Sequence, residues 1–322
     1  MTELSWPRGK QCTFDSSSEL LRELFERDSN DWIYRGQANF DWPISSTLSR
    51  ALIQQAKNGG PIGQDLFTCK AVCPKRDDHA LMVEQLLLRE FILQAEGLSI
   101  ANLPPYQDRL GWWELMQHHG VPTRLLDWSR SPFVALWFAI NDPDVVEKVD
   151  ASITVLNVHN IWLAHAQWIL EEETRHVSWS EFRNDRVQQN HWAERLIKSD
   201  NALVPLEISP RHPAPRVVAQ QSIMTLMPRI TECSSNYLAE RLSTKIRICA
   251  EWKPELRQRC EDQGITRFSL YRDLDTLGRE LGNQLGNNNL IAQPEAAIRE
   301  LHRMQSEFQR NSPRETEENE GA

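Results

Sequence analysis

The sequence lacks the hallmarks of several common classes of protein. It contains no run of about 18 apolar residues, the length that a membrane-spanning helix needs. Its first residues, MTELSWPRGK, lack the apolar segment of a signal peptide. The 322 residues include only six cysteines, and these are scattered, as is typical of a chain with reduced thiols. We therefore expect a cytoplasmic protein with no membrane partner.

Signatures of metal and nucleotide sites are also missing. Cys69 and Cys73 lie close together, but no second pair of cysteines or histidines follows at the spacing of a zinc site, so we expect no metal. The glycine-rich loops of P-loop and dinucleotide-binding folds are absent, as is the Gly-x-Ser-x-Gly turn of many hydrolases. Any nucleotide must therefore be bound without these loops.

The charge balance is acidic, with a formal net charge of -9. Broad affinity for nucleic acid rests on neutralisation of phosphates by Lys and Arg, so this balance disfavours it. A local basic cleft is still compatible with the sequence. The hydrophobic content of 40% is enough to bury a real core.

The periodicity of apolar residues predicts the secondary structure. Helices are predicted over residues 16–27, 79–96, 109–119, 131–140, 254–263 and 274–285, and strands over 31–36, 151–158, 203–208, 216–227 and 244–250. Helices and strands do not alternate strictly, which argues against a doubly wound parallel sheet. We predict a single α+β domain with a mixed or antiparallel sheet and flanking helices.

Composition also predicts where the domain begins and ends. Residues 1–16 form an N-terminal approach segment, and 17–290 form the domain. A C-terminal helix follows over 291–310. The charged stretch NSPRETEENEGA, 311–322, is predicted to be a disordered tail.

The first candidate site is the segment Tyr34-Arg35-Gly36-Gln37, at the end of a predicted strand. An arginine can bind a phosphate or carboxylate through two hydrogen bonds. Gly36 has no side chain, so a ligand or another backbone could approach. The alternative is a surface ion pair at Arg35 and a plain turn at Gly36, which these four residues alone favour.

The second candidate is the stretch MQHHGVPTRLLDWSRSPFVALWFAI, which starts at Met116. His118 and His119 end a helix, and the carbonyl end of a helix favours a protonated histidine. Thr123, Arg124 and Asp127 follow. Asp127 could orient Arg124 or a histidine, or it could simply pair with Arg124.

The apolar part of this stretch has a simpler interpretation. Ser131 and Pro132 are typical of the start of a helix, and Gly120 is typical of the residue that follows one. The aromatic residues Trp128, Trp137 and Phe138 are most simply core. The tryptophans of residues 161–198 could form a partner surface, but core is again the interpretation we favour.

The third candidate is RVVAQQSIMTL, from Arg216, within a predicted strand. Glutamines in a hydrophobic strand are costly unless they are hydrogen-bonded. Since adjacent side chains of a strand face opposite ways, only one of Gln220 and Gln221 should face a given cleft. The alternative is an edge strand with solvated glutamines.

These segments carry a family resemblance. The stretches YRGQANFDWPISSTLSR, LMQHHGVPTRLLDWSRSPFVALWFA, RVVAQQSIMTL, KIRI and GITRFSLYRDLDTLG resemble an FRG domain, over about residues 32–278. Three departures occur: Tyr34 replaces the Phe of the naming motif, Ser222 replaces a Gly, and Tyr271-Arg272 replaces Phe-Pro. Proteins of this kind recur among prophage, defence and toxin-like genes of bacteria.

The order of the motifs is similar to that of ADP-ribosyltransferases. Carried over, Arg35 matches their first motif, residues 123–129 the second, and Gln220 or Gln221 the third. The resemblance implies NAD as substrate, with its pyrophosphate held by Arg35 and Arg124. Cleavage develops positive charge on the ribose, where a carboxylate helps and a glutamine supplies only a dipole. Asp127 or an unidentified Glu must then supply that charge.

The resemblance thus assigns roles to twelve residues. The implied catalytic residues are His119, Asp127 and Gln221. The implied ligand-binding residues are Tyr34, Arg35, Gly36, Gln37, His118, Thr123, Arg124, Trp128 and Gln220, with Trp128 or Tyr34 stacking on the nicotinamide.

Three functions are compatible with the sequence. The first is an NAD-using ADP-ribosyltransferase or NAD glycohydrolase, a defence or toxin-type effector with a protein or nucleic-acid acceptor. The second is a non-catalytic sensor of a small nucleotide ligand, and the third is a protein-interaction scaffold. For the first two we predict that the three segments converge on one cleft, with Arg35 close to His119 and Gln221, and residues on opposite faces would exclude a shared site.

Overall fold

We analysed a computed structural model of the chain. It describes residues 6–27, 31–58, 78–98, 100, 102–142, 145, 147–172, 179–199, 204–208, 210, 214–230, 236–286, 299 and 303. Cys69, Cys73 and the tail 311–322 lie outside these ranges, as does the predicted helix 291–310 apart from Arg299 and Arg303. The chain divides into two compact units at Leu270.

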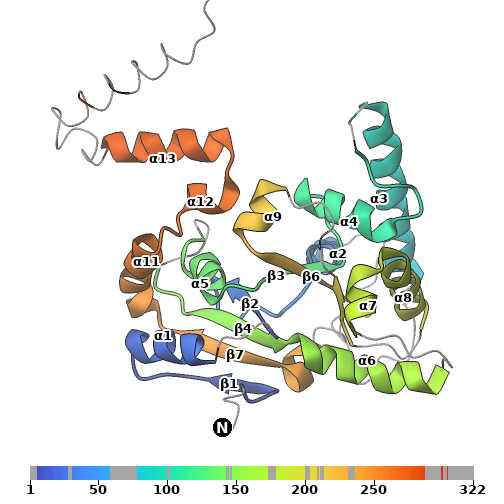
Figure 1. Cartoon of the computed structure of the whole chain (residues 1–322), viewed down its shortest axis with the longest axis horizontal. Helices are drawn as coiled ribbons and strands as arrows, with labels where there is room; N and C mark the ends of the chain where they lie inside the picture. Colours follow the sequence, from blue (N-terminus) through green and yellow to red (C-terminus); the bar gives the residue numbers. More distant parts are fainter. Residues whose placement is uncertain are drawn as a thin grey trace, which may run out of the picture. The chain divides into compact units, whose positions relative to one another are not determined.

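A mixed sheet is the centre of the first unit (Figure 1). Its seven strands within the described residues lie in the order β1-β7-β4-β2-β3-β6-β5. They are β1 (Lys10–Cys12), β2 (Trp32–Gln37), β3 (Leu125–Ser129), β4 (Ala151–Asn157), β5 (Leu206–Ile208), β6 (Ser222–Leu226) and β7 (Ser243–Ile248). Neighbouring strands are antiparallel, except that β1 and β7 are parallel.

The sheet is divided at its middle. β2 pairs with β4 along its whole length, from Trp32 to Gln37, and β3 pairs with β6 along its whole length. Between β2 and β3, by contrast, the registered pairing is confined to Tyr34 and Ser129. The two central strands therefore diverge beyond this pair and leave a gap.

Helices pack on both sides of this sheet. Those of the first unit are α1 (Ser17–Glu26), α2 (Thr47–Lys57), α3 (Asp78–Gly97), α4 (Arg109–His118), α5 (Pro132–Ile140), α6 (Val158–Glu172), α7 (Trp179–Asn184), α8 (Arg186–Lys198), α9 (Pro215–Ala219), the π-helical turn η2 (Leu238–Leu242), the 3-10 turn η3 (Ala250–Trp252) and α11 (Lys253–Asp262). α12 (Arg267–Tyr271) ends at the boundary, and α13 (Leu274–Gly286) belongs to the second unit.

Hydrophobic clusters hold these layers together, and two of them cover opposite faces of the sheet. One joins α3, α4 and α8 to β5 and β6 through residues such as Trp112, Trp192 and Leu226. The other covers the opposite face, around Ile33 and Leu126. Trp192 is buried, and Trp162 packs against the same cluster, so these two residues of the tryptophan-rich region are core.

Helix α5 approaches β2 unusually closely. A Cβ atom at Gly36 would lie 1.9 Å from the carbonyl oxygen of Ala135, far inside van der Waals contact. The glycine thus admits another backbone, which decides between the alternatives that the sequence left open. Ser131 begins α5, because its hydroxyl accepts a hydrogen bond from the N–H of Val134, and Pro132 follows in the first turn.

Most predicted elements are confirmed, including α1, α3, α4, α5, β2, β4, β7, α11 and α13 and the mixed sheet with flanking helices. The predicted strand 216–227 is half wrong. Its first part is the helix α9, and only Ser222–Leu226 is a strand. The sequence did not predict α2, β1 or β3. None of the helices described is long and apolar enough to cross a membrane.

Candidate functional site

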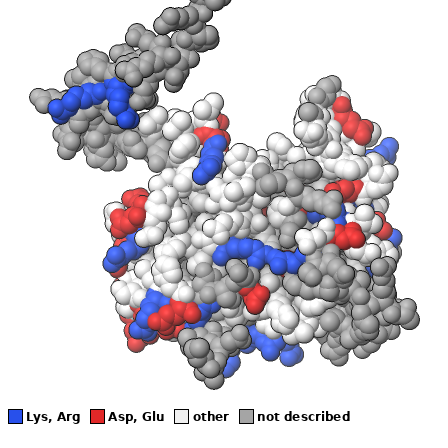
Figure 2. All heavy atoms as spheres, in the orientation of Figure 1, with Lys and Arg blue, Asp and Glu red and all other residues white. Residues whose placement is uncertain are grey.

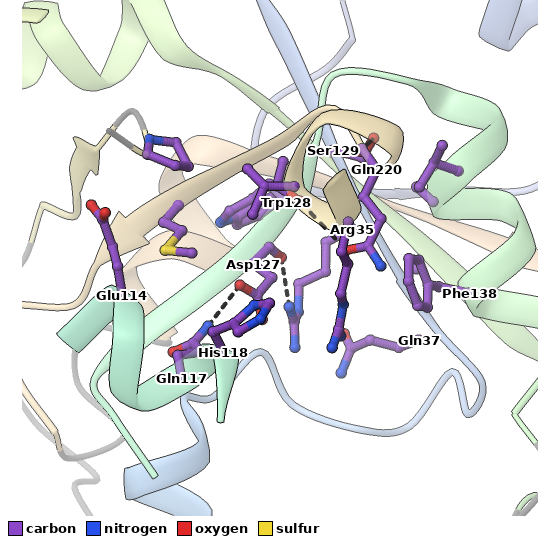
Figure 3. A pocket seen from close by; sticks show the side chains of 18 of the residues that line it. Arg35, Gln37, Glu114, Gln117, His118, Asp127, Trp128, Ser129, Phe138 and Gln220 are labelled. Atoms are coloured by element: carbon purple, nitrogen blue, oxygen red, sulfur yellow. Dashed lines mark hydrogen bonds between the residues drawn. The ribbon is translucent and has the colours of Figure 1, made fainter. Parts of the chain in front are cut away.

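A cleft of about 1360 Å³ opens where β2 and β3 diverge. Its lining comes from β2, β3, α2, α4, α5, α9 and the start of β6, together with residues 42–45. Figure 3 shows Arg35, Asp127 and His118 gathered in it, with Gln220 and Phe138 on another side of Arg35. All three candidate segments of the sequence therefore contribute to one site.

Arg35 bridges the gap between the two strands. Its Nη1 donates a hydrogen bond of 2.6 Å to the backbone carbonyl of Asp127. Its Nε is buried and has no hydrogen-bond partner in the described structure. Burial lowers the pKa of this guanidinium, while the Asp127 carboxylate acts to raise it. A buried donor without a partner is costly, so the site is suited to an acceptor group of a ligand.

Asp127 presents its carboxylate to the cleft from β3. Its Oδ1 accepts a hydrogen bond of 2.7 Å from Nε2 of Gln117, on α4. Oε1 of Gln117 accepts a hydrogen bond from the hydroxyl of Thr123, so the orientation of the amide is defined. The N–H of Thr123 donates in turn to Thr47, the first residue of α2, at 3.0 Å. Asp127 is thus an exposed carboxylate held in place by a chain of hydrogen bonds.

Gln117 was missed in the sequence, although it lies within the second candidate stretch. Glutamine at the end of a helix carries no distinctive signal. What identifies its role is that α4 and β3 lie side by side, which the sequence did not reveal because β3 was not predicted.

Basic side chains surround this pair. Arg50 and Lys57 of α2, Arg216 of α9, and His118 and His119 all line the cleft. Burial lowers the pKa of His118, and the nearby His119 and Arg216 lower it further. Glu114, Asp127 and Asp142 also line the cleft, so its lining carries charges of both signs. Elsewhere, on the face drawn in Figure 2, acidic and basic side chains are interspersed and form no broad basic surface.

Arg124 has a different role from the one predicted. Its side chain is completely buried and does not line the cleft. Its Nε and Nη2 bind the two carboxylate oxygens of Glu84, at 2.7 and 2.5 Å. Its Nη1 binds the carbonyls of Met227 and Pro228. Arg124 is therefore a structural residue, and the interpretation that Asp127 pairs with it is also wrong.

Two aromatic candidates for stacking are also core residues. Trp128 is buried, and its Nε1 donates to the hydroxyl of Thr225 at 2.9 Å. Tyr34 is buried with no exposed surface. The rings that line the cleft and retain exposure are Phe138 of α5 and Trp42, which is 42% exposed.

The two glutamines of the third segment both lie in the turn between α9 and β6, so the alternation of a strand does not apply to them. Gln220 lines the cleft, and its Nε2 donates to the carbonyl of Leu270 at 3.3 Å. Gln221 is exposed outside the cleft, with a φ of 46°, and its carbonyl accepts from the N–H of Arg130. The prediction that Gln221 meets Arg35 and His119 in one cleft is therefore wrong, and Gln220 is the glutamine of this segment that lines the cleft.

The remaining predicted residues can now be placed. Tyr34, Arg35, Gly36, Gln37, His118, His119, Asp127, Trp128 and Gln220 line the cleft, and Thr123, Arg124 and Gln221 do not. Thr123 is buried behind it, where it positions Gln117. Among the described residues, no group of three or more His, Cys, Asp or Glu side chains could hold a metal ion.

Fold and site together define a protein with a cleft in a divided mixed sheet, and basic side chains form part of its lining. Residues 30–148 match the model of the FRG domain, and the chain therefore carries an FRG domain. The match includes β2 and β3, and hence both Arg35 and Asp127. Searches among curated proteins and among solved structures find no match to this chain.

Proposed function

We propose that the cleft binds NAD and cleaves its N-glycosidic bond, as an ADP-ribosyltransferase or NAD glycohydrolase. The observation that carries the proposal is the pairing of Arg35 with Asp127 across the gap between β2 and β3. It places a cation with an unpartnered buried donor next to an exposed, oriented carboxylate. These are the two charges that a reaction of a pyrophosphate-bearing glycoside requires.

The step can be assigned to these residues. The bond between the ribose C1 and the nicotinamide nitrogen breaks, and nicotinamide leaves with the bonding electrons. The Asp127 carboxylate stabilises the positive charge that develops on the ribose. A water molecule, or the hydroxyl of an acceptor, then bonds to C1 and gives its proton to Asp127. Asp127 thus supplies the charge that Gln220 lacks.

The other polar groups of the cleft bind and orient. Arg35 would hold the pyrophosphate. Phe138, rather than Trp128 or Tyr34, would stack on the nicotinamide. Loss of cellular NAD through such an activity would suit the defence or toxin-type role that the family resemblance implies.

The test is release of nicotinamide, measured by chromatography after incubation with NAD. We expect turnover by the protein, loss of at least about a hundredfold in Asp127→Asn, and retained NAD binding by calorimetry in that variant. Asparagine still accepts the hydrogen bond from Gln117, so the fold should persist. Asp15→Asn, at an exposed residue outside the cleft, is the control.

A non-catalytic nucleotide sensor is the second candidate. It is favoured by Gln220, which stands at the third motif without a carboxylate and whose amide is engaged by Leu270. Binding of NAD without product in every assay, including those with cell lysate as acceptor, would establish this function and refute catalysis. Absence of NAD binding would refute both.

A further inference from the structure

The cleft is larger than one dinucleotide site requires. Sites for small ligands and cofactors commonly enclose about 300–1000 Å³. The cleft encloses about 1360 Å³, and part of its lining is assigned no role by the proposed function. That part is formed by helix α2 and residues 42–45, neither of which the sequence had marked as a site.

Helix α2 turns one polar face toward the cleft. Arg50, Ile53, Gln54 and Lys57 all line it, at the i, i+3, i+4 and i+7 spacing that places side chains on one face of a helix. Arg50 and Lys57 are two turns apart, which corresponds to about 10 Å along the helix axis. The face therefore offers two cations to an extended anionic ligand.

A buried hydroxyl accompanies the first of these cations. Nη1 of Arg50 donates to the carbonyl of Ser45 at 2.5 Å, which places the guanidinium next to this residue. Ser45 is 5% exposed and lines the cleft, and its hydroxyl has no hydrogen-bond partner among the described residues. A phosphate would accept hydrogen bonds from both groups and satisfy the buried hydroxyl.

An aromatic ring lies at the start of the same segment. Trp42 lines the cleft and keeps 42% of its surface exposed. Its carbonyl accepts a hydrogen bond of 2.9 Å from Nζ of Lys245, on β7. The neighbouring ring of Phe40 lies under the guanidinium of Arg247, at 3.7 Å. These contacts fix the backbone that carries the exposed indole, and the indole offers a stacking surface for a base.

We infer that α2 and residues 42–45 form a second subsite, which binds a nucleotide 5′-phosphate at Arg50 and Ser45 and stacks its base on Trp42. Lys57 binds a further phosphate when the nucleotide is the end of an oligonucleotide. The inference concerns the same cleft as the proposed function and names the class of its second substrate. A short ligand fits an acidic chain that shows no broad basic surface on the face drawn in Figure 2.

The experiment is calorimetric titration with uridine 5′-monophosphate and with a 5′-phosphorylated oligouridylate, both without NAD. A pyrimidine is used because NAD contains none. We expect binding of at least one probe, weakened about tenfold by Trp42→Leu and by Arg50→Gln. Lys57→Ala should weaken only the oligonucleotide, and its affinity should then depend less steeply on salt.

Matched controls separate the subsite from general charge. Lys198→Ala is the control for Lys57→Ala, because each removes the charge of the lysine that ends its helix, α8 or α2. Arg22→Gln is the control for Arg50→Gln and removes the charge of an exposed arginine of α1. Thermal unfolding identifies any variant that fails to fold. In that case Trp42→Phe, which keeps a ring, should retain binding. Absence of binding by both probes overturns the inference, as does equal weakening by the controls.

Two further comparisons identify the kind of ligand and show whether its subsite is separate from the NAD site. Binding of the mononucleotide indicates a free nucleotide, and binding of the oligonucleotide alone indicates a nucleic-acid end. Where NAD binds, a titration at saturating NAD should still show probe binding, and displacement of the probe by NAD overturns the second subsite. If NAD does not bind, the proposed function fails, while the probe affinities and their dependence on Trp42 and Arg50 still decide the inference.

Discussion

Two arginines near the middle of the sheet, Arg35 on β2 and Arg124 just before β3, make opposite uses of the same side chain. Arg124 is fully buried, and its bonds to Glu84 and to two carbonyls engage Nε, Nη1 and Nη2. Arg35 makes one hydrogen bond, and its buried Nε has no partner within the described structure. A satisfied arginine stabilises the fold, whereas an unsatisfied one next to a cleft is available to a ligand.

The largest expected effect is on stability, at Arg124, the arginine whose nitrogens are all hydrogen-bonded. Arg124→Met leaves the Glu84 carboxylate buried without its partner, so the free energy of unfolding should fall by about 3–5 kcal/mol. Urea unfolding measures it. The double variant Arg124→Met with Glu84→Met should recover most of the loss, because both charges are then removed. A single variant as stable as the wild type would contradict the role given to Arg124.

The buried His165 should make the stability of the fold depend on pH, because its charge changes with pH. His165 is 4% exposed, burial lowers its pKa to about 4, and its Nε2 bonds the carbonyl of Pro205. Because the folded pKa lies below the unfolded value of about 6.5, this group adds stability above pH 6.5 that is lost as the pH falls toward 4.

The measurement compares the wild type with His165→Gln, which keeps a donor for Pro205 but does not titrate. Between pH 7 and pH 4.5 the stability of the wild type relative to the variant should fall by about 2–3 kcal/mol, in urea unfolding at each pH. A difference that stays constant with pH would show that His165 does not titrate in this way.

Replacing Arg35, the arginine with the unpartnered Nε, by methionine should weaken ligand binding rather than stability. Arg35→Met removes one hydrogen bond and one unpartnered buried donor, so unfolding free energy should change by less than about 1 kcal/mol. NAD affinity, measured by calorimetry, should fall about a hundredfold. Arg22→Met, at an exposed residue of α1, is the control. A large loss of stability with unchanged affinity would make Arg35 a structural residue like Arg124.

Gln117 tests whether orientation of Asp127 matters. Gln117→Met removes the donor to Asp127 and should lower the turnover of NAD about tenfold with little change in KM. Gln94→Met removes a comparable exposed hydrogen bond, to Glu90 on α3, and should leave turnover unchanged. Equal activity of the two variants would show that Asp127 needs no positioning.

The smallest effect is expected at Gln221. Its φ of 46° is strained for a residue with a Cβ, and glycine relieves that strain at some entropic cost in the unfolded chain. Gln221→Gly should therefore raise the unfolding free energy by about 0.5 kcal/mol, with NAD binding unchanged. Weaker NAD binding by this variant would show that Gln221 contributes to the binding site.

The elements that the sequence predicts well have local signals. Ser131 and Pro132 begin α5, and Gly120, with a φ of 79°, follows α4, because caps and turns depend on near neighbours. β3 has no such signal. Four of its residues are buried, on both faces, so its sequence does not alternate. The helix α9 was taken for a strand because its valines favour strands.

The site was predictable only in part, because it depends on pairing between distant segments. The sequence identified Arg35, Asp127 and Gln220 as candidates, and they do share the cleft. It could not distinguish Arg35 from Arg124, since Glu84 lies 40 residues before Arg124. Nor could it place α2 beside the cleft, which brought Arg50, Lys57 and the stacking surface of Trp42 into the site.

The single pair between Tyr34 and Ser129 also has a consequence for hydrogen exchange. It joins the half-sheet β1-β7-β4-β2 to the half-sheet β3-β6-β5. Backbone amides of β2 that face β4 are protected by a full ladder, whereas on the other side the registered pairing with β3 is confined to Tyr34. One strand thus has a slowly exchanging edge and a rapidly exchanging edge. A ligand that fills the gap would shield the amides on this side of β2, and its binding could be followed one amide at a time.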